Sequence, residues 1–344
     1  MPDVSAPRGD LERVVREHVK RTSGRYVGLA IGAIAGNERV TVGVGRTAER
    51  GDAPDDGTIF QIGSVTKVLT SLLLADAVLR REVALDQPLA TLIPETATHA
   101  SGRPITLVDL ATHSSGLPRL PPGLARQALR NRADPYASLT TTQLVAALGR
   151  TPRRAPGTAV RYSNFGAGIL GEALSRAGGS SFESLVSSRI AQPLGMHDTV
   201  VHGSAEQQGR RAVGHSRRRR PVPDWQLPAM PGAGALRSTM TDLLALLDAH
   251  LRPERSPLTA AIGLAMEPRT AAGRRLRVGL GWHVLARKGA TDLWWHNGGT
   301  GGYFSIVAAD PANGAAVAVL TNTARSVDRL GMKILDHLVR TPAG

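Results

Sequence analysis

Residues 60–67 read Phe60-Gln61-Ile62-Gly63-Ser64-Val65-Thr66-Lys67 and open an apolar run that ends near Arg81. We expect this run to be a helix with Ser64 in its first turn. Residues three positions apart share a helix face, so the Lys67 amine can meet the Ser64 hydroxyl. A lysine takes a serine proton only when burial or a neighbouring cation lowers the pKa of the amine. The segment therefore predicts a nucleophile with its own base, although a helix-capping serine followed by a surface lysine is the simpler alternative.

The composition is that of a soluble globular protein. The chain has 344 residues, of which 42% are hydrophobic and 20% are charged, enough for one large domain or two with a substantial core. Its formal charge of +14 comes mostly from arginines scattered along the sequence. A continuous run occurs at Arg217–Arg220, with Arg210 and Arg211 shortly before it. We interpret this run as a basic loop and expect no nucleic-acid partner.

Several kinds of site and segment are disfavoured by what the sequence lacks. Without cysteine, the chain can form no disulfide and no thiolate metal site. Its ten histidines form no His-Glu-x-x-His motif or compact cluster, so we expect no metal and no cofactor. The first 25 residues lack the apolar core of a signal peptide, and no stretch reaches the roughly 20 apolar residues of a membrane-spanning helix. We therefore expect a cytoplasmic protein with no membrane span.

Hydrophobic periodicity places strands near both chain ends and helices between them. Residues 10–21 have the spacing of an amphipathic helix. Strands are expected at residues 26–34, 39–45, 278–286, 292–296, 303–309 and 315–321, and a last helix at 326–339. Between these strands, from about residue 82 to 260, we expect helices. Four sequences typical of a helix N-terminus precede apolar runs there: Thr106-x-x-Asp109, Thr140-x-x-Gln143, Ser180-x-x-Glu183 and Thr239-x-x-Asp242. Residues 205–231 are polar and punctuated by proline, so we expect a long surface loop able to overhang the site.

These elements predict a mixed α/β (α+β) fold. Short connections between the terminal strands favour antiparallel pairing, so we expect a sheet built from both chain ends, flanked by helices, with a mainly helical region inserted. The predicted single domain spans residues 10–340. Its α/β part comprises about 10–80 and 270–340, and the helical insert about 82–260. Residues 1–9 and 341–344 are expected to be tails.

A second group of chemically useful residues follows 98 positions after Ser64, at Arg161-Tyr162-Ser163-Asn164. Beside a cationic lysine the phenolate of Tyr162 is favoured, so this tyrosine could relay protons. Asn164 offers both a donor and an acceptor, which suits holding Lys67 or a substrate amide. The structural alternative is a half-buried Tyr162, with Ser163 or Asn164 capping the next helix.

A third group lies at Trp295-His296-Asn297-Gly298-Gly299-Thr300-Gly301-Gly302-Tyr303. Glycines at the end of a strand let a substrate lie against the backbone, and exposed N–H groups there can face a developing oxyanion. A phosphate-binding loop is the rival interpretation. It fails because such a loop precedes a helix, whereas a β-like run follows here.

Taken together, these motifs resemble those of the serine β-lactamase and penicillin-binding-protein superfamily. Ser64-x-x-Lys67, Tyr162-x-Asn164 and His296-Asn297-Gly298 match its three motifs in order and setting, most closely in the branch of class C β-lactamases, D-stereospecific peptidases and esterases. The resemblance covers roughly residues 10–340. Further matches are Leu85-Asp86-x-Pro88, Thr112-His113-Ser114-Ser115-Gly116-Leu117-Pro118, Pro156-Gly157, Pro193-Leu194-Gly195-Met196, Gly234-Ala235-Leu236-x-Ser238-Thr239 and Gly279-Leu280-Gly281-Trp282.

The resemblance implies a β-lactamase/transpeptidase-like fold and a role for each motif residue. Ser64 would be the acylated nucleophile, and Lys67 and Tyr162 would be the pair that handles protons. Asn164 would position Lys67 and substrate. No glutamate matches the deacylating glutamate of class A enzymes, so deacylation would also run through Tyr162 and Lys67.

The third motif departs from the β-lactamase pattern. It implies substrate-binding and oxyanion roles for His296, Gly298 and Gly299, with the backbone N–H groups of Ser64 and Gly299 forming the oxyanion hole. β-Lactamases usually carry a lysine where this chain has His296. A neutral imidazole holds a substrate carboxylate less firmly than a lysine does. We therefore expect inefficient β-lactam hydrolysis.

The predicted function is a serine hydrolase that acts through a Ser64 acyl-enzyme on an ester, an amide or D-peptide, or a β-lactam. Its partner would be a small-molecule or short-peptide acyl substrate. An esterase or peptidase fits better than an efficient β-lactamase. Two alternatives stay open: an acyltransferase that uses the same acyl-enzyme, and a silent relative that binds peptidoglycan-like peptides.

Overall fold

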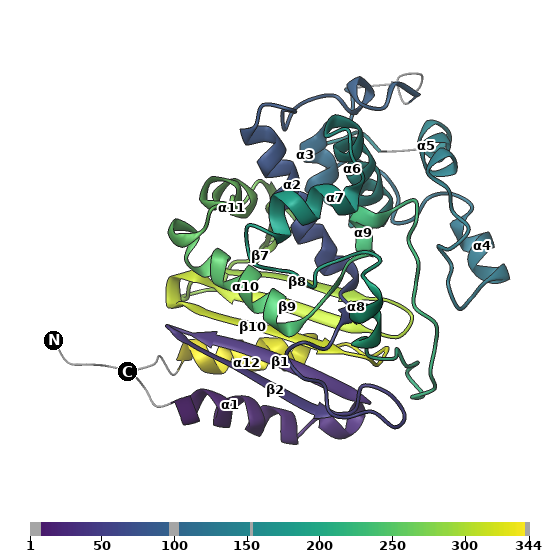
Figure 1. Cartoon of the computed structure of the whole chain (residues 1–344). Coiled ribbons are helices and arrows are strands. Elements are labelled where there is room, and N and C mark those ends of the chain that lie inside the picture. The colour runs from purple at the N-terminus through teal and green to yellow at the C-terminus, as the bar shows by residue number, and fades with distance from the viewer. Residues whose placement is uncertain (1–7, 96–102, 152–153, 341–344) are drawn as a thin grey trace.

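A computed structural model describes residues 8–95, 103–151 and 154–340 (Figure 1). Of the predicted tails, residues 1–7 and 341–344 lie outside the described residues. The central element is an antiparallel sheet with strand order β2-β1-β10-β9-β8-β7-β6-β5, and β3 pairs separately with β4. The strands are β1 (Gly28–Ala35), β2 (Glu38–Gly45), β3 (Phe60–Gln61), β4 (Arg237–Ser238), β5 (Thr270–Ala271), β6 (Leu276–Val278), β7 (His283–Leu285), β8 (Leu293–Gly299), β9 (Phe304–Asp310) and β10 (Ala315–Thr321).

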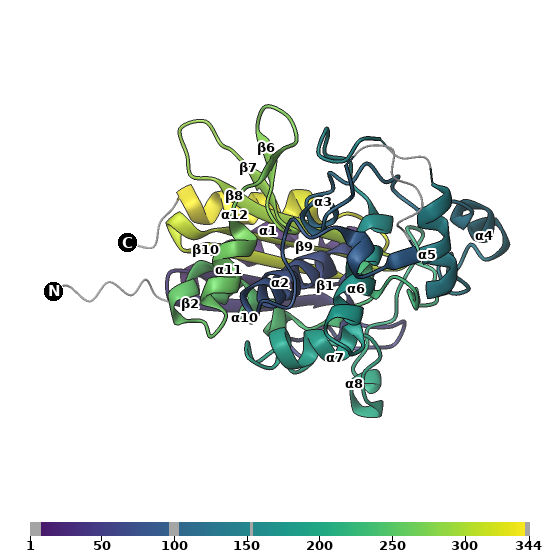
Figure 2. The ribbon, with the colours of Figure 1, turned by 90° about the horizontal axis from the view of Figure 1, so that it is seen from above.

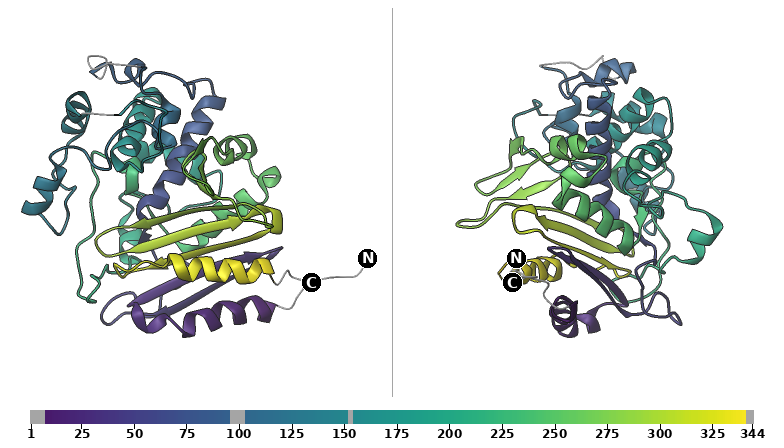
Figure 3. Two further views of the ribbon diagram at one scale, coloured as in Figure 1. Left: turned by 180° about the vertical axis from the view of Figure 1, so that it is seen from behind. Right: turned by 60° about the vertical axis from the view of Figure 1, so that its left-hand side comes forward.

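Helices cover both faces of this sheet. Figure 3 shows α1 and α12 on one face, whereas α10 and the larger helical region lie on the other. Figure 2 shows α4 and α5 at one end of the molecule, beyond α6. The α-helices are α1 (Arg8–Lys20), α2 (Thr66–Leu79), α3 (Leu107–Ala111), α4 (Leu124–Arg130), α5 (Thr141–Arg150), α6 (Asn164–Ala177), α7 (Phe182–Val186), α8 (Ala205–Gly209), α9 (Pro231–Gly234), α10 (Met240–Leu251), α11 (Thr259–Met266) and α12 (Asp328–Arg340).

Strands from the two ends of the chain pair with each other inside the sheet, next to its β2 edge. β1 pairs with β10 along its length, from Leu29 opposite Thr321 to Ala35 opposite Ala315. Both strands are almost wholly apolar because helices bury both of their faces. The hairpin from β1 to β2 turns at Gly36, whose φ of 55° suits glycine. The predicted antiparallel sheet built from both termini is therefore confirmed.

One predicted strand is divided in the structure. Residues 278–286 read as a single β run, but the chain forms β6 and β7 with a turn between them. Gly281 has a φ of 72°, and a Cβ there would lie 2.5 Å from the Lys67 carbonyl oxygen. The strand breaks because the turn packs directly against α2, a long-range contact that local periodicity does not reveal.

Two other local expectations need correction. The capping sequence predicted at Ser180 is shifted by one residue, since Ser181 accepts the hydrogen bond from the Ser184 N–H. Residues 205–231 are not wholly a surface loop: they begin with the short helix α8, and the buried Leu227 and Met230 anchor their last part. The presence of these apolar side chains in an otherwise polar segment could have indicated that its last part is buried.

The helix α2 is buried on all sides. Every residue from Thr66 to Ala77 is buried, and α6, α7, α9 and α11 all contact this helix. A helix that is apolar around its whole circumference belongs in a core rather than on a surface. Its first turn thus carries Lys67 into the protein interior. Among the helices of the described ranges, none has the length and apolar character needed to cross a bilayer.

Shortening a core side chain of α2 should cost substantial stability. Leu72 is 0% exposed, so Leu72→Ala should lower the free energy of unfolding by about 2–5 kcal/mol through lost burial and the cavity left behind. Leu79→Ala, on the same helix at 49% exposure, should change it by less than about 0.5 kcal/mol. Urea unfolding measures both, and equal losses would contradict the burial of α2.

Candidate active site

Ser64 lies in a tight turn that leads directly into α2. The turn is a 3-10 helix, Gly63–Val65, rather than the first turn of α2 as predicted. Gly63 has a φ of 49°, which a residue with a side chain adopts only with strain. Ser64 is partly exposed, whereas Lys67, one turn further on, is 2% exposed. The turn therefore presents the hydroxyl to solvent and the amine to the core.

The Lys67 amine is held by three oxygen atoms. Its Nζ lies 3.0 Å from Ser64 Oγ, 2.9 Å from Asn164 Oδ1 and 2.6 Å from the Ala233 carbonyl oxygen. Within the described ranges no carboxylate forms an ion pair with it. Burial, with a smaller effect of the Arg119 charge, lowers the pKa of Lys67 well below its ordinary 10.5.

An uncharged amine suits this arrangement because it has two N–H donors and one lone pair. The amide oxygen of Asn164 and the carbonyl of Ala233 can only accept, so they take the two N–H groups. The third contact is with Ser64 Oγ: a protonated amine donates to this oxygen, whereas an uncharged amine would accept the hydroxyl proton through its lone pair. The predicted contact between Ser64 and Lys67 is present, and the lowered pKa of the amine is what a lysine needs to accept a serine proton.

Tyr162 lies over this pair, but the structure does not favour the phenolate that the sequence suggested. The Lys67 Nζ is 4.9 Å from the centre of the Tyr162 ring. Burial raises the pKa of Tyr162 to about 12, and a hydrogen bond with Ser64 and the Arg119 charge offset only part of that effect. The lowered pKa of Lys67 disfavours the ammonium cation that would stabilise a phenolate beside it. Tyr162 is therefore a proton donor at neutral pH.

Asn164 opens α6, and its neighbour Ser163 is the cap. The Ser163 hydroxyl accepts a hydrogen bond from the Gly166 N–H at 2.9 Å and donates to the Pro118 carbonyl. The Asn164 backbone N–H donates to the Arg119 carbonyl at 2.9 Å. These bonds fix the helix start, so the Asn164 side chain is free to reach Lys67.

The end of β8 lies directly against the turn that carries Ser64. A Cβ added to Gly298 would stand 2.0 Å from the Ile62 carbonyl oxygen and 2.8 Å from the Ser64 nitrogen. A Cβ on Gly63 would stand 2.6 Å from the Gly299 nitrogen. Only glycine permits this approach. The structure thus brings together the Ser64 and Gly299 backbones that were predicted to form the oxyanion hole.

His296 lies behind the cavity wall rather than in it. It is 1% exposed, its Nδ1 lies 2.7 Å from the Asn297 carbonyl oxygen, and its ring stacks on His283 with 5.0 Å between centroids. Burial and the neighbouring His283 lower the pKa of His296 well below 6.5. A neutral, buried ring gives no support to the predicted direct contact with substrate.

Three histidines surround the Tyr162 ring. The ring centroids of His113, His296 and His283 lie 4.6, 6.2 and 6.4 Å from that of Tyr162. The His113 Nδ1 accepts a hydrogen bond from the Ser163 N–H at 3.3 Å. Burial lowers the pKa of His283 to about 4. Over the described ranges, no group of three or more His, Asp or Glu residues is arranged to hold a metal.

Ser64 opens into a cavity of ≈ 480 Å³. The sequence analysis did not identify Arg119 and His283 as residues that line this cavity. Each directly follows a segment that matches the family, Arg119 after Pro118 and His283 after Trp282, and this position was the available clue. Trp225 comes from the loop that was expected to overhang the site. The lining consists of Ser64, Arg119, Leu120, Tyr136, Tyr162, Asn164, Trp225, His283, Asn297, Gly298, Gly299, Thr300 and Phe304.

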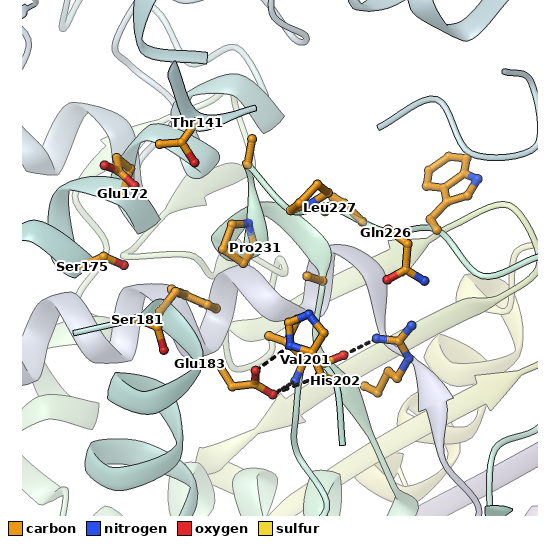
Figure 4. Close-up of a pocket in the computed structure, with 16 residues that line it drawn as sticks. Thr141, Glu172, Ser175, Ser181, Glu183, Val201, His202, Gln226, Leu227 and Pro231 are labelled. Atoms are coloured by element: carbon orange, nitrogen blue, oxygen red, sulfur yellow. Dashed lines mark hydrogen bonds and ion pairs between the residues drawn. The ribbon is translucent and has the colours of Figure 1, made fainter. Parts of the chain in front are cut away.

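A second cavity, of ≈ 410 Å³, shares Trp225 with the first and is lined mainly by α6, α7 and residues 225–231 (Figure 4). Its charged groups are already engaged. The Glu183 carboxylate accepts the N–H groups of Val201 and His202, and Arg237 donates to the Val201 carbonyl (Figure 4). The described lining includes serines but no lysine. The Ser64 cavity is therefore the candidate catalytic site.

Comparison with known proteins supports this assignment. The family model described as Beta-lactamase matches residues 11–341. The chain belongs to the beta-lactamase family. This membership confirms the resemblance drawn from the three motifs, and with it the prediction of a serine hydrolase.

Relatives and solved structures agree with the family assignment. D-alanyl-D-alanine-carboxypeptidase/endopeptidase AmpH of Escherichia coli (strain K12) is 31% identical over 333 residues, 89% of this chain and 82% of that protein. Penicillin-binding protein 4 of Amycolatopsis lactamdurans is 27% identical over 294 residues, 79% of this chain and 74% of that protein. The crystal structure of D-alanine carboxypeptidase AmpC from Burkholderia cenocepacia has a TM-score of 0.84 at 24% identity, covering 96% of this chain and 99% of that one. The predicted fold class is confirmed.

The lowered pKa of Lys67 should be visible in the pH profile. For an uncharged ester, kcat/KM should rise with pH as Lys67 loses its proton and should level off well below pH 10.5. Below that lowered pKa the protonated amine cannot accept the Ser64 proton, so activity falls. Lys67→Arg should reduce kcat/KM by roughly 10²–10⁴-fold, whereas Lys333→Arg, on the exposed side of α12, should not. A rise centred near pH 10.5 would contradict the buried neutral amine.

Adding one methyl group to Gly298 should damage catalysis specifically. The Cβ of Gly298→Ala would push β8 away from the Ser64 turn and disturb the oxyanion donors, so kcat should fall by about 10²–10³-fold. Gly263→Ala is the control, because a Cβ in that part of α11 meets nothing within 4 Å. Steady-state kinetics and circular dichroism on both variants make the comparison. An unchanged kcat in Gly298→Ala would show that this contact does not shape the site.

Proposed function

We propose that this chain is a hydrolase that forms an acyl-enzyme on Ser64 and cleaves an ester, an amide or D-peptide, or a β-lactam bond. The observation that carries the proposal is the buried Lys67 amine, 3.0 Å from Ser64 Oγ, with its remaining hydrogen-bond positions taken by two acceptors. Esterase- or peptidase-like action fits better than efficient β-lactam hydrolysis.

Acylation follows from the geometry. The Lys67 amine takes the proton of Ser64 as Oγ attacks the substrate carbonyl carbon. Negative charge develops on the carbonyl oxygen, where the backbone N–H groups of Ser64 and Gly299 would receive it. The neutral Tyr162 phenol gives its proton to the leaving group and regains one from Lys67. Asn164 keeps the lysine aligned throughout.

Deacylation reverses these roles. Water enters where the leaving group stood, Tyr162 and Lys67 together remove its proton, and the same backbone donors hold the second oxyanion. The bond between the acyl carbon and Ser64 Oγ then breaks, and Oγ takes a proton from Lys67. The site residues named from the sequence suffice for both half-reactions.

Two observations favour an acyl substrate of short-peptide size. The cavity of ≈ 480 Å³ lies within the range of pockets that enclose small ligands. AmpH of E. coli, which is similar to most of this chain, is named a D-alanyl-D-alanine-carboxypeptidase/endopeptidase. Against efficient β-lactam hydrolysis stands the neutral, buried His296 in the position where β-lactamases usually carry lysine.

Three broader expectations complete the proposal. We propose that residues 10–340 act as one catalytic domain, because the candidate site combines β8 from the C-terminal part with α6 from the helical part. Cytoplasmic location and the absence of a nucleic-acid partner stay predictions from the sequence.

Intact-protein mass spectrometry tests the acyl-enzyme. Brief incubation in parallel with a p-nitrophenyl acyl ester, a chromogenic cephalosporin and a fluorophosphonate should give adducts and ester turnover in the wild type. Ser64→Ala should give neither, whereas Ser188→Ala, at an exposed serine, should behave as wild type. Labelling that persists in Ser64→Ala would overturn the assignment of the nucleophile.

The same samples test substrate preference. Ester turnover well above cephalosporin turnover supports the esterase or peptidase assignment, and rapid cephalosporin hydrolysis would contradict it. Adding an amine or alcohol separates hydrolysis from acyl transfer, because an acyltransferase would give mostly the conjugated product rather than the free acid.

A further inference from the structure

Arg119 brings a positive charge to the wall of the catalytic cavity. Its guanidinium carbon lies 5.2 Å from the centre of the Tyr162 ring, and its side chain is exposed. The Arg119 carbonyl accepts the N–H groups of Asn164 at 2.9 Å and Phe165 at 3.3 Å. This backbone contact ties Arg119 to the start of α6, so its position relative to Tyr162 is fixed.

The charge of Arg119 is available to a ligand. Among the described residues that line the cavity, it alone carries a permanently charged side chain. Burial disfavours the charged form of its neighbours: it lowers the pKa of Lys67 well below 10.5 and that of His283 to about 4. No carboxylate within the described ranges forms an ion pair with Arg119. A guanidinium in this setting matches the two oxygens of a carboxylate.

The position of Arg119 shows which end of the substrate it would meet. Tyr162 is the proposed proton donor to the leaving group, and Arg119 lies over the Tyr162 ring. We propose that Arg119 pairs with a free carboxylate on the leaving group and so selects acyl donors that release an α-amino or α-hydroxy acid. This assignment rests on the proposed Ser64 acyl-enzyme function. It gives Arg119 the anion-binding task that the buried His296 cannot perform.

Two matched depsipeptides test the assignment. Both carry the same N-acyl-D-alanyl group; one has D-lactate as its leaving group and the other has D-lactamide. In each, the bond between the acyl carbon and the ester oxygen breaks, water supplies hydroxide to the acyl carbon, and the leaving oxygen takes a proton. The two substrates differ only in the charge of the leaving group. The ratio of their kcat/KM values therefore isolates recognition of the carboxylate.

The wild type should prefer the lactate ester, and Arg119→Gln should reduce that preference by roughly 10–100-fold. Arg119→Lys should keep part of it, because the charge stays but the two-point contact is lost. Arg161→Gln is the matched control: Arg161 is exposed, close in sequence to Tyr162, and not among the described cavity walls. In the wild type, the preference should also decline as salt screens the ion pair.

The ratio of kcat/KM for the lactate ester to kcat/KM for the lactamide ester separates carboxylate recognition from an effect of Arg119 on proton transfer. Arg119 also contributes to the lowered pKa of Lys67, but solvent screens the charge of this exposed guanidinium, so that effect changes the ratio far less than loss of the ion pair does. If Arg119→Gln lowers both kcat/KM values while leaving their ratio unchanged, Arg119 acts only on proton transfer and the proposal is wrong. If wild-type protein hydrolyses neither ester and forms no Ser64 adduct, the proposed function itself is overturned, a failure visible without any Arg119 variant.

Discussion

The buried amine of Lys67 is the feature on which the rest of this structure depends. No carboxylate within the described ranges pairs with it, so burial lowers its pKa well below 10.5 and favours the uncharged form. The apolar helix α2 provides the burial. The carbonyl of Ala233 before β4 and the amide of Asn164 at the start of α6 provide the acceptors. The inserted helical region therefore sets the surroundings of Lys67, in addition to shaping the cavity of Ser64.

A second constraint is the close contact between β8 and the turn that carries Ser64. These segments are more than 200 residues apart in sequence, and their contact depends on the order β1-β10-β9-β8 in the sheet. Ser305 in β9 donates to the Ile62 carbonyl at 2.7 Å, which ties the sheet to the turn. Gly298 allows the strand to come within backbone distance. This close approach brings the backbone of Gly299, at the end of β8, next to that of the turn that carries Ser64.

The sequence predicted what depends on local pattern and motif spacing. Ser64 and Lys67 are three residues apart, so helical geometry alone brings them together. β10 was placed correctly because it is an unbroken apolar run. The division of residues 278–286 and the raised pKa of Tyr162 could not be predicted, because both arise from contacts with distant segments. The pKa of Tyr162 is raised mainly by burial, and the sequence does not show how deeply Tyr162 and Lys67 are buried.

His283 and His296, on the sheet side of the cavity, have lowered pKa values and carry no charge at neutral pH. The positive charge at the cavity wall therefore comes from Arg119, on the opposite side. This placement links substrate binding to proton transfer. In the free protein, the Arg119 charge disfavours protonated Lys67. A carboxylate bound to Arg119 would offset that charge, so Lys67 would accept the Ser64 proton more readily once substrate is in place. Because Arg119 is exposed, solvent screens this coupling and keeps it modest, and burial remains the larger cause of the lowered pKa of Lys67.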